Sequence, residues 1–149
     1  MVQRILFVCL GNICRSPTAE AVTRRMAAER GVTVELDSAG TGDWHVGKPP
    51  YAPMQAAAKA RGYDLSQLCA RQISSSDFNR FDMIVTMDAQ NRADVEALRS
   101  DPGGARVVAF TDYAPDAGYT EVPDPYFTRD FGEALALVET CAAGLLDSL

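Results

Sequence analysis

The sequence contains little histidine, no long apolar run and few basic residues in its last third. Among its 149 residues are one His, one Trp and four Cys. The cysteines show no Cys-x-x-Cys spacing, and the single His45 leaves too few ligands for a zinc site. The apolar run at residues 5–8 is far shorter than the roughly 18 residues of a membrane helix. We therefore expect a cytoplasmic protein without a secretory signal, a membrane-inserted segment or a metal site.

Charge is distributed unevenly along the chain, although the composition is ordinary. Hydrophobic residues make up 47% and charged residues 23%, which is usual for one globular domain, here residues 1–149. The formal net charge is −6: residues 1–30 carry +3, residues 31–87 carry −1 and residues 88–149 carry −8. This acidity argues against nucleic acid as a partner. The basic first segment still allows an anionic substrate to bind there.

Apolar segments of strand length alternate with helical segments four times. We expect strands at residues 5–8, 32–36, 83–87 and 106–110. We expect helices at residues 16–30, 53–61, 88–99 and 131–145, a turn at 101–104, and long loops at 40–53 and 111–128. Ser16 and Pro17 have the types preferred for the cap and first residue of a helix. The alternation predicts an α/β domain, in which a four-stranded parallel sheet has helices on both faces.

The chain between the first strand and the first helix has the residues of an anion site. Cys9 ends the strand, at the edge where parallel sheets bind ligands, and Arg15 follows where the helix begins. Gly11 and Asn12 tolerate a positive φ, so the loop can turn its N–H groups inward. Inward N–H groups, the helix dipole and the guanidinium fork of Arg15 all favour a bound phosphate.

The same positive field makes Cys9 a candidate nucleophile. A helix N-terminus and a nearby cation favour the thiolate form of cysteine, and a thiolate that faces an oxyanion site is an activated nucleophile. Ser16 can donate a hydrogen bond to the sulfur and help it to leave. The alternative interpretation is a small buried cysteine at a strand end, with Ser16 serving only as a helix cap.

At this point the sequence resembles a known family, the low-molecular-weight protein tyrosine phosphatases. Residues 8–17, VCLGNICRSP, resemble the signature of that family. Five later segments resemble the family in the same order, so the resemblance covers nearly the whole chain. These segments are residues 37–40, 44–47, 70–73, 87–91 and 123–126. The resemblance implies the flavodoxin-like fold of these phosphatases.

The resemblance also implies an activity: hydrolysis of phosphotyrosine in proteins through a phosphocysteine intermediate, without a metal or cofactor. Cys9 is the implied nucleophile, Arg15 the phosphate-binding cation and Asp124 the general acid and base. Asp124 lies between two prolines, which stiffen its loop. The other implied substrate-binding residues are Leu10, Gly11, Asn12, Ile13, Cys14 and Ser16 in the loop and the aromatic walls Trp44 and Tyr126.

Residues around the loop are expected to support it or to depart from the family. Asn12 and Ser38 are expected to brace the loop from behind, and Asp88 is expected to be only a helix cap. Relatives often have a His at the position of Leu68, where it helps to hold Asn12, and an Asp at the position of Tyr51. We therefore expect the support of Asn12 and part of the rim to differ in this chain.

The four cysteines divide into two pairs. We hypothesise that oxidation pairs Cys9 with Cys14 and protects Cys9 from irreversible over-oxidation. Cys69 and Cys141 are expected to be buried, reduced thiols without a functional role.

Three other functions compete with phosphotyrosine hydrolysis. Arsenate reductases share the fold and the Cys-x5-Arg loop but need two further cysteines, and residues 70–100 contain none. Protein-arginine phosphatases are similar but carry Thr at the position of Ile13, which together with Trp44 favours phosphotyrosine. A non-catalytic phosphate-binding module is disfavoured because a nucleophile, a cation and an acid are all present. The expected partner is a tyrosine-phosphorylated protein, with a bacterial-type tyrosine kinase as the candidate, and we expect a monomer or weak dimer.

Overall fold

A four-stranded parallel sheet forms the centre of the molecule. The computed structural model describes residues 2–100 and 102–149. The strands are β1 (Gln3–Cys9), β2 (Val34–Gly40), β3 (Met83–Thr86) and β4 (Arg106–Ala109). They lie in the order β2-β1-β3-β4, and each neighbouring pair is parallel. The predicted sheet is therefore confirmed, because parallel neighbours need helical crossovers of the kind that the sequence pattern indicates.

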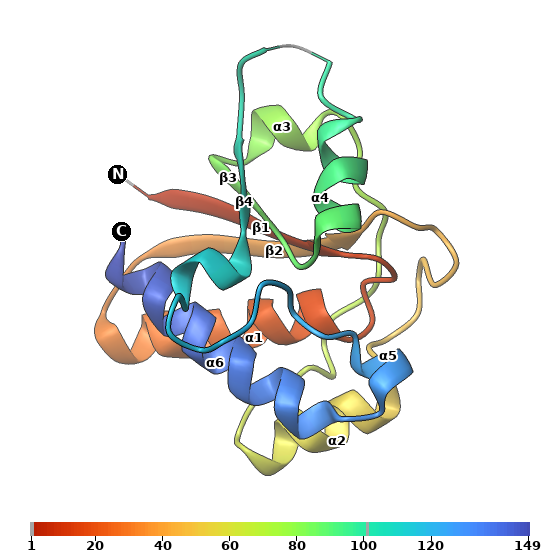
Figure 1. The fold of residues 1–149 in the computed structure, drawn as a ribbon, viewed down its shortest axis with the longest axis vertical. Helices are drawn as coiled ribbons and strands as arrows, with labels where there is room; N and C mark the ends of the chain where they lie inside the picture. The colour runs from red at the N-terminus through yellow and green to blue at the C-terminus, as the bar shows by residue number, and fades with distance from the viewer. Residues whose placement is uncertain (1, 101) are drawn as a thin grey trace.

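Helices cover both faces of this sheet (Figure 1). One face carries α1 (Arg15–Arg30), α2 (Ala52–Ala60) and α6 (Phe131–Asp147), and the other carries α3 (Asp77–Arg80) and α4 (Ala89–Glu96). Successive side chains of β1 point to opposite faces, so Ile5 and Phe7 join one core, and Leu6 and Val8 join the other. All four are fully buried, which explains the unbroken apolar run in the sequence.

Several element bounds differ from the sequence-based expectations. β2 continues to Gly40 because its last residues pair with β1, where Ser38 lies opposite Phe7. α4 ends at Glu96: the N–H of Ala97 still bonds four residues back, but those of Leu98 and Arg99 bond three residues back and tighten the last turn. The predicted loop of residues 111–128 contains two short helices, the 3-10 helix η1 (Phe110–Tyr113) and α5 (Pro125–Thr128). Of the predicted turn at 101–104, Asp101 lies outside the described residues.

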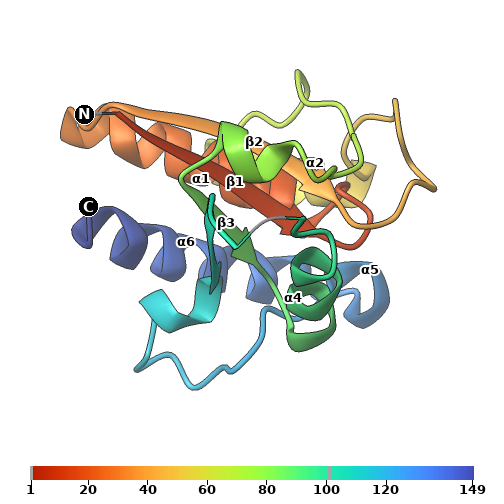
Figure 2. The same cartoon turned by 90° about the horizontal axis from the view of Figure 1, so that it is seen from above.

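The carboxyl end of β1 points toward the end of the molecule that holds α2 and α5 (Figure 2). The loop after β1, the loop after β2 and α5 therefore meet at this edge of the sheet, as expected for a parallel fold. Throughout the described ranges, none of the helices combines the length and the apolarity that crossing a bilayer requires.

Candidate active site

A pocket of about 230 Å³ opens beyond the carboxyl end of β1. Nine of the predicted site residues line it: Cys9, Leu10, Gly11, Ile13, Cys14, Arg15, Trp44, Asp124 and Tyr126. Asn12 and Ser16 lie behind the lining and reach it through hydrogen bonds. His45 and Phe127 also line the pocket but were not predicted. Each directly follows a predicted aromatic wall residue, and this adjacency is the signal that could have found it.

The loop between β1 and α1 curls around the sulfur of Cys9. Asn12 has a φ of 56°, the left-handed conformation that the sequence suggested, whereas Gly11 keeps a φ outside that region. Space is tight at Gly11, because a Cβ there would lie 3.0 Å from the His45 ring and that ring would have to shift slightly. The turn directs the backbone N–H of Asn12 to Cys9 Sγ at 3.2 Å, and Ser16 Oγ lies 3.0 Å from the same sulfur. Both groups can stabilise negative charge on the sulfur.

Ser16 does not cap α1, so this part of the prediction is wrong. The helix begins at Arg15, with Cys14 in the cap position, and Ser16 lies in the first turn. Its hydroxyl contacts Cys9 Sγ and donates to the carbonyl of Ala39 at 3.3 Å. A helix whose N-terminus faces an anion site needs no side-chain cap, because the anion can accept from the unpaired N–H groups.

The Asn12 side chain holds the loop from behind, as expected. Its amide group donates to Ser16 Oγ at 2.7 Å and to Ser38 Oγ at 3.0 Å. Its carbonyl oxygen accepts from the backbone N–H of Arg71 at 3.0 Å. Leu68, at the position where relatives often have a His, instead packs against the hydrophobic core. Asn12 is therefore well bonded without that His.

The network continues to Glu20, a residue that sequence reasoning did not find. Ser38 Oγ donates to one oxygen of Glu20 at 2.8 Å, and Arg24 pairs with the other at 2.6 Å. The Glu20 side chain is buried on α1. Charged helical residues are rarely buried unless paired, and nothing in the sequence marks this one as different. Through its bonds to Ser38 and Arg24, Glu20 connects the loop to the exposed side of α1.

Arg15 is held rigidly beneath the pocket, with 3% of its side chain exposed. Its Nη1 donates to Asp88 at 2.7 Å and to the carbonyl of Val122 at 3.1 Å, and its Nη2 lies 3.3 Å from Asp124. Burial by itself would lower the Arg15 pKa, but the negative charges of Cys9, Asp124 and Asp88 raise it overall. The guanidinium is therefore fixed in its charged form beside the sulfur.

Asp88 does more than the sequence predicted. Its Oδ1 accepts the backbone N–H of Asn91 at 2.7 Å and so caps α4, as expected. Its Oδ2 pairs with Arg15. The expectation that Asp88 is only a helix cap is thus wrong, because one carboxylate serves both a helix end and the guanidinium of Arg15. Asp88 follows β3 and therefore lies at the same sheet edge as Cys9. This shared edge is the feature of the sequence that could have indicated the contact of Asp88 with Arg15.

Asp124 lies at the start of α5 and faces the pocket from the opposite wall. It caps α5 by accepting the backbone N–H of Tyr126 at 3.1 Å, and it contacts Arg15. Its side chain is 22% exposed, so both substrate and water can reach it. A carboxyl group in this position can exchange protons with a molecule bound above Cys9.

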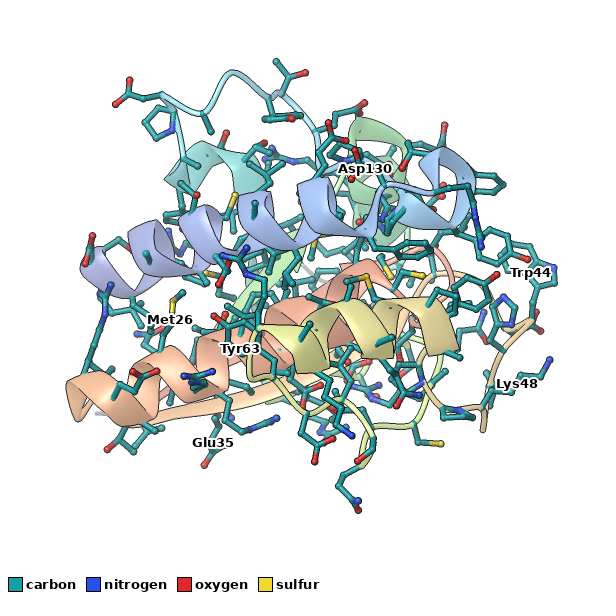
Figure 3. All side chains as sticks on the ribbon, turned by 90° about the horizontal axis from the view of Figure 1, so that it is seen from below. Met26, Glu35, Trp44, Lys48, Tyr63 and Asp130 are labelled. Carbon is teal, nitrogen blue, oxygen red and sulfur yellow. The ribbon has the colours of Figure 1, made fainter. Side chains whose placement is uncertain are left out.

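The walls of the pocket are aromatic and open to solvent. Trp44 is 65% exposed and Tyr126 is 41% exposed. Figure 3 shows Trp44 and Lys48 at the same end of the molecule, away from Met26 and Glu35. Tyr51 packs against Tyr126 with ring centroids 5.2 Å apart, so this tyrosine forms part of the rim, and its difference from the family stays a prediction. The walls can hold a planar ring, since aromatic faces stack favourably.

The remaining cysteines differ in burial. Burial raises the pKa of the Cys14 thiol to about 12, and the charge of Cys9 acts in the same direction. Cys14 thus stays protonated at neutral pH, and its pairing with Cys9 on oxidation stays a prediction. Cys141 is buried as expected, but Cys69 is exposed, so that expectation is wrong. Within residues 2–100 and 102–149, no three His, Cys, Asp or Glu side chains are grouped so as to hold a metal ion.

The chain is similar to one protein family over almost its entire length. A model of the family described as low molecular weight phosphotyrosine protein phosphatase matches residues 4–149. The low molecular weight protein-tyrosine-phosphatase YfkJ of Bacillus subtilis is 40% identical over 97% of this chain and 94% of its own. A low molecular weight phosphotyrosine protein phosphatase of Schizosaccharomyces pombe is 41% identical over 98% of this chain and 96% of its own.

Solved structures show the same similarity. The crystal structure of YfkJ superposes with a TM-score of 0.94 at 39% identity, covering 99% of this chain and 94% of that chain. The structure of a Drosophila arginine phosphatase superposes with a TM-score of 0.91 at 30% identity, covering 97% and 96%. The fold is thus shared by phosphatases whose names give two different phosphorylated residues.

Proposed function

Because this chain belongs to the low molecular weight phosphotyrosine protein phosphatase family, we propose that it hydrolyses phosphotyrosine in proteins through a phosphocysteine intermediate. The observation that carries this proposal is the meeting of a nucleophile, a cation and an acid in one pocket. Cys9 and Arg15 flank the loop between β1 and α1, Asp124 lies 109 residues after Arg15, and all three line the same space. The reaction needs no metal or cofactor, since these three residues supply attack, charge and proton.

In the first step, Cys9 Sγ attacks phosphorus. The S–P bond forms as the bond to the tyrosine oxygen breaks, and Asp124 donates its proton to that leaving oxygen. Arg15 and the inward N–H groups bind the three remaining oxygens, whose charge the transition state spreads. Because the guanidinium is already fixed, this stabilisation requires little reorganisation.

In the second step, a water molecule releases the phosphate. The Asp124 carboxylate takes a proton from water, the water oxygen attacks phosphorus, and the S–P bond breaks. The sulfur leaves as a thiolate, to which the N–H of Asn12 donates a hydrogen bond, and the Ser16 hydroxyl can turn its single hydrogen from the Ala39 carbonyl to this sulfur. Asp124 ends protonated and Cys9 ends ionised, so the site is ready for a new substrate.

The walls favour phosphotyrosine over phosphoarginine. Trp44 and Tyr126 present aromatic faces to the pocket, and the buried side chain of Ile13 adds an apolar contact. A phenyl ring gains from such contacts and needs no hydrogen-bond partner, whereas the N–H donors of a guanidinium group also need acceptors. The similarity to an arginine phosphatase keeps phosphoarginine as the second candidate. We further propose tyrosine-phosphorylated proteins of the cytoplasm as substrates, with a bacterial-type tyrosine kinase as the candidate.

The test is the hydrolysis of p-nitrophenyl phosphate by the wild type and Cys9→Ser at pH 5 to 7, with EDTA present. We expect activity in the wild type and none in Cys9→Ser. The rate should pass through a maximum as pH changes, because the mechanism needs an ionised Cys9 and a protonated Asp124 at the same time. Cys69→Ser is the matched control, since Cys69 is exposed and lies outside the pocket.

Phosphotyrosine and phosphoarginine peptides then separate the two candidates. A higher kcat/KM for phosphotyrosine supports the proposal. A higher kcat/KM for phosphoarginine would show that phosphoarginine, and not phosphotyrosine, is the preferred substrate. Unchanged activity in Cys9→Ser, or its loss with EDTA alone, would contradict cysteine-based hydrolysis. Phosphate binding without turnover in the wild type would favour a binding module.

A further inference from the structure

Arg129 is an exceptional residue in its part of the chain. It is the only Lys or Arg after Arg106, in a region where acidic residues predominate. It ends α5 with a φ of 63°, a left-handed conformation that glycine adopts more easily than arginine. The chain thus places its one local cation at a position that disfavours a side chain.

The Arg129 guanidinium lies on an aromatic platform at the rim of the pocket. Its Cζ is 5.3 Å from the ring centroid of Tyr51 and 5.2 Å from that of Phe131. Nη1 donates to the Tyr51 hydroxyl at 3.0 Å and to the backbone carbonyl of Tyr126 at 3.4 Å. Cation–π contacts and these two bonds fix the plane of the guanidinium. Tyr51 thus supports the cation through both its ring and its hydroxyl group.

Most of the donors on this guanidinium are free. A guanidinium has five N–H donors, and the contacts with the described residues engage only Nη1. Across residues 2–100 and 102–149, no carboxylate forms an ion pair with Arg129, and its side chain is exposed. It bonds to Tyr126, which lines the pocket, and its charge acts on the buried thiol of Cys14. An oriented, unpaired cation therefore borders the site.

We propose that Arg129 binds the carboxylate of a glutamate or aspartate close to the phosphotyrosine in the substrate, and so selects acidic sequences. This inference rests on the proposed function of the pocket. Nε and Nη2 together offer the parallel donors that a carboxylate accepts in a bidentate pair. Because Tyr51 and Phe131 already hold the guanidinium in place, binding of a carboxylate costs little additional side-chain entropy. The other charged residues in this third of the chain are mostly acidic and repel an acidic peptide. Arg129 therefore determines where the acidic side chain of the peptide binds.

The experiment compares matched phosphotyrosine peptides that carry Glu or Gln at each position near the phosphotyrosine. The dissociation constants are measured with Cys9→Ser, so the readout does not require turnover. We expect a Glu peptide to bind about three- to fivefold more tightly than its Gln partner, as suits an exposed ion pair. The ratio should approach one in Arg129→Gly and at high salt. Glycine suits the φ of this position, so the variant keeps its turn.

Two further variants make the test specific. Arg106→Gln removes an exposed cation outside the pocket lining and should leave the Glu-to-Gln ratio unchanged. Lys48→Gln removes the exposed cation near Trp44 and should also leave it unchanged. The proposal is overturned if the wild-type ratio is one, if the ratio survives in Arg129→Gly, or if Lys48→Gln abolishes it. Failure of the phosphatase proposal is separate, since it appears as a lack of wild-type turnover.

Discussion

The floor and the rim of the pocket are built in different ways. The floor consists of buried groups, among them Cys9, Asn12 and Arg15, each held by hydrogen bonds to neighbouring residues. The rim consists of exposed aromatic side chains, Trp44 and Tyr126, and the Tyr126 ring packs against the rings of His45 and Tyr51. The floor is therefore rigid, and the rim is free to adapt to what binds there.

This difference suits the two regions to different roles: the floor to the phosphoryl group, and the rim to the rest of the substrate. A phosphoryl group is the same in every substrate, so a fixed set of donors can be aimed at its transition state. The molecule attached to the phosphoryl group varies, so recognition depends on contact surfaces and on a single oriented cation. Substitutions in the floor should reduce turnover steeply, whereas those in the rim should change substrate preference.

The largest effect is expected at Asn12, where the floor depends on one side chain. Asn12→Gly keeps the positive φ but removes three hydrogen bonds, which leaves Ser38 and the Arg71 N–H without this partner. We expect kcat to fall about 10- to 100-fold, since each buried unpaired group costs about 1–3 kcal/mol. Steady-state kinetics with p-nitrophenyl phosphate measure this.

Asn12→Ala separates the side chain from the backbone. Alanine loses the same hydrogen bonds and is also strained at a φ of 56°, which costs roughly 1–2 kcal/mol more. We expect a lower free energy of unfolding than for Asn12→Gly, measured by urea denaturation. Equal stability of the two variants would show that the positive φ of residue 12 adds no strain, and wild-type turnover in Asn12→Gly would show that the loop does not depend on this network.

A smaller effect is expected at Asp88, which tests how firmly the floor holds Arg15. Asp88→Asn keeps a good helix cap but removes the negative charge that pairs with Arg15 at 2.7 Å. A neutral hydrogen bond is about half as strong as a charged one, so we expect kcat/KM to fall about tenfold with little loss of stability. Asp88→Ala also removes the cap and should lower the free energy of unfolding by about 1 kcal/mol more. Equal activity of Asp88→Asn and the wild type would mean that Val122 and the loop suffice to fix Arg15.

The fold could be predicted from the sequence because its determinants are local. Apolar runs, helical spacing and glycines gave the four strands and the long helices, and only their ends shifted. The short α3 and α5 could not be found, because four residues carry too little periodicity. α5 begins where the Asp124 side chain accepts the N–H of Tyr126. It ends at Arg129, whose guanidinium lies on the ring of Tyr51, the residue before α2.

The sequence predicted the site residues that have a single role. It was less informative about residues that contact two parts of the structure at once. Cys9, Arg15 and Asp124 stand in recognisable segments and do line one pocket. Ser16 and Asp88 have the residue types of helix caps, but their partners across the sheet edge give them other contacts. Glu20 and Arg129 depend on neighbours 18 and 78 residues away, and local sequence holds no trace of such pairs.

The smallest effect is expected at Trp44, and it tests whether the two regions act independently. Trp44→Ala removes a largely exposed ring from the rim, so stability should not change. We expect KM for phosphotyrosine peptides to rise about three- to tenfold with kcat nearly constant, because one aromatic contact is worth about 0.5–1.5 kcal/mol. The inhibition constant of inorganic phosphate, which needs only the floor, should stay the same. Val46→Ala is the matched control, since Val46 is exposed in the same loop but does not line the pocket. If Trp44→Ala weakened phosphate as much as the peptide, the rim would be shaping the floor, and the two could not be treated as separate regions.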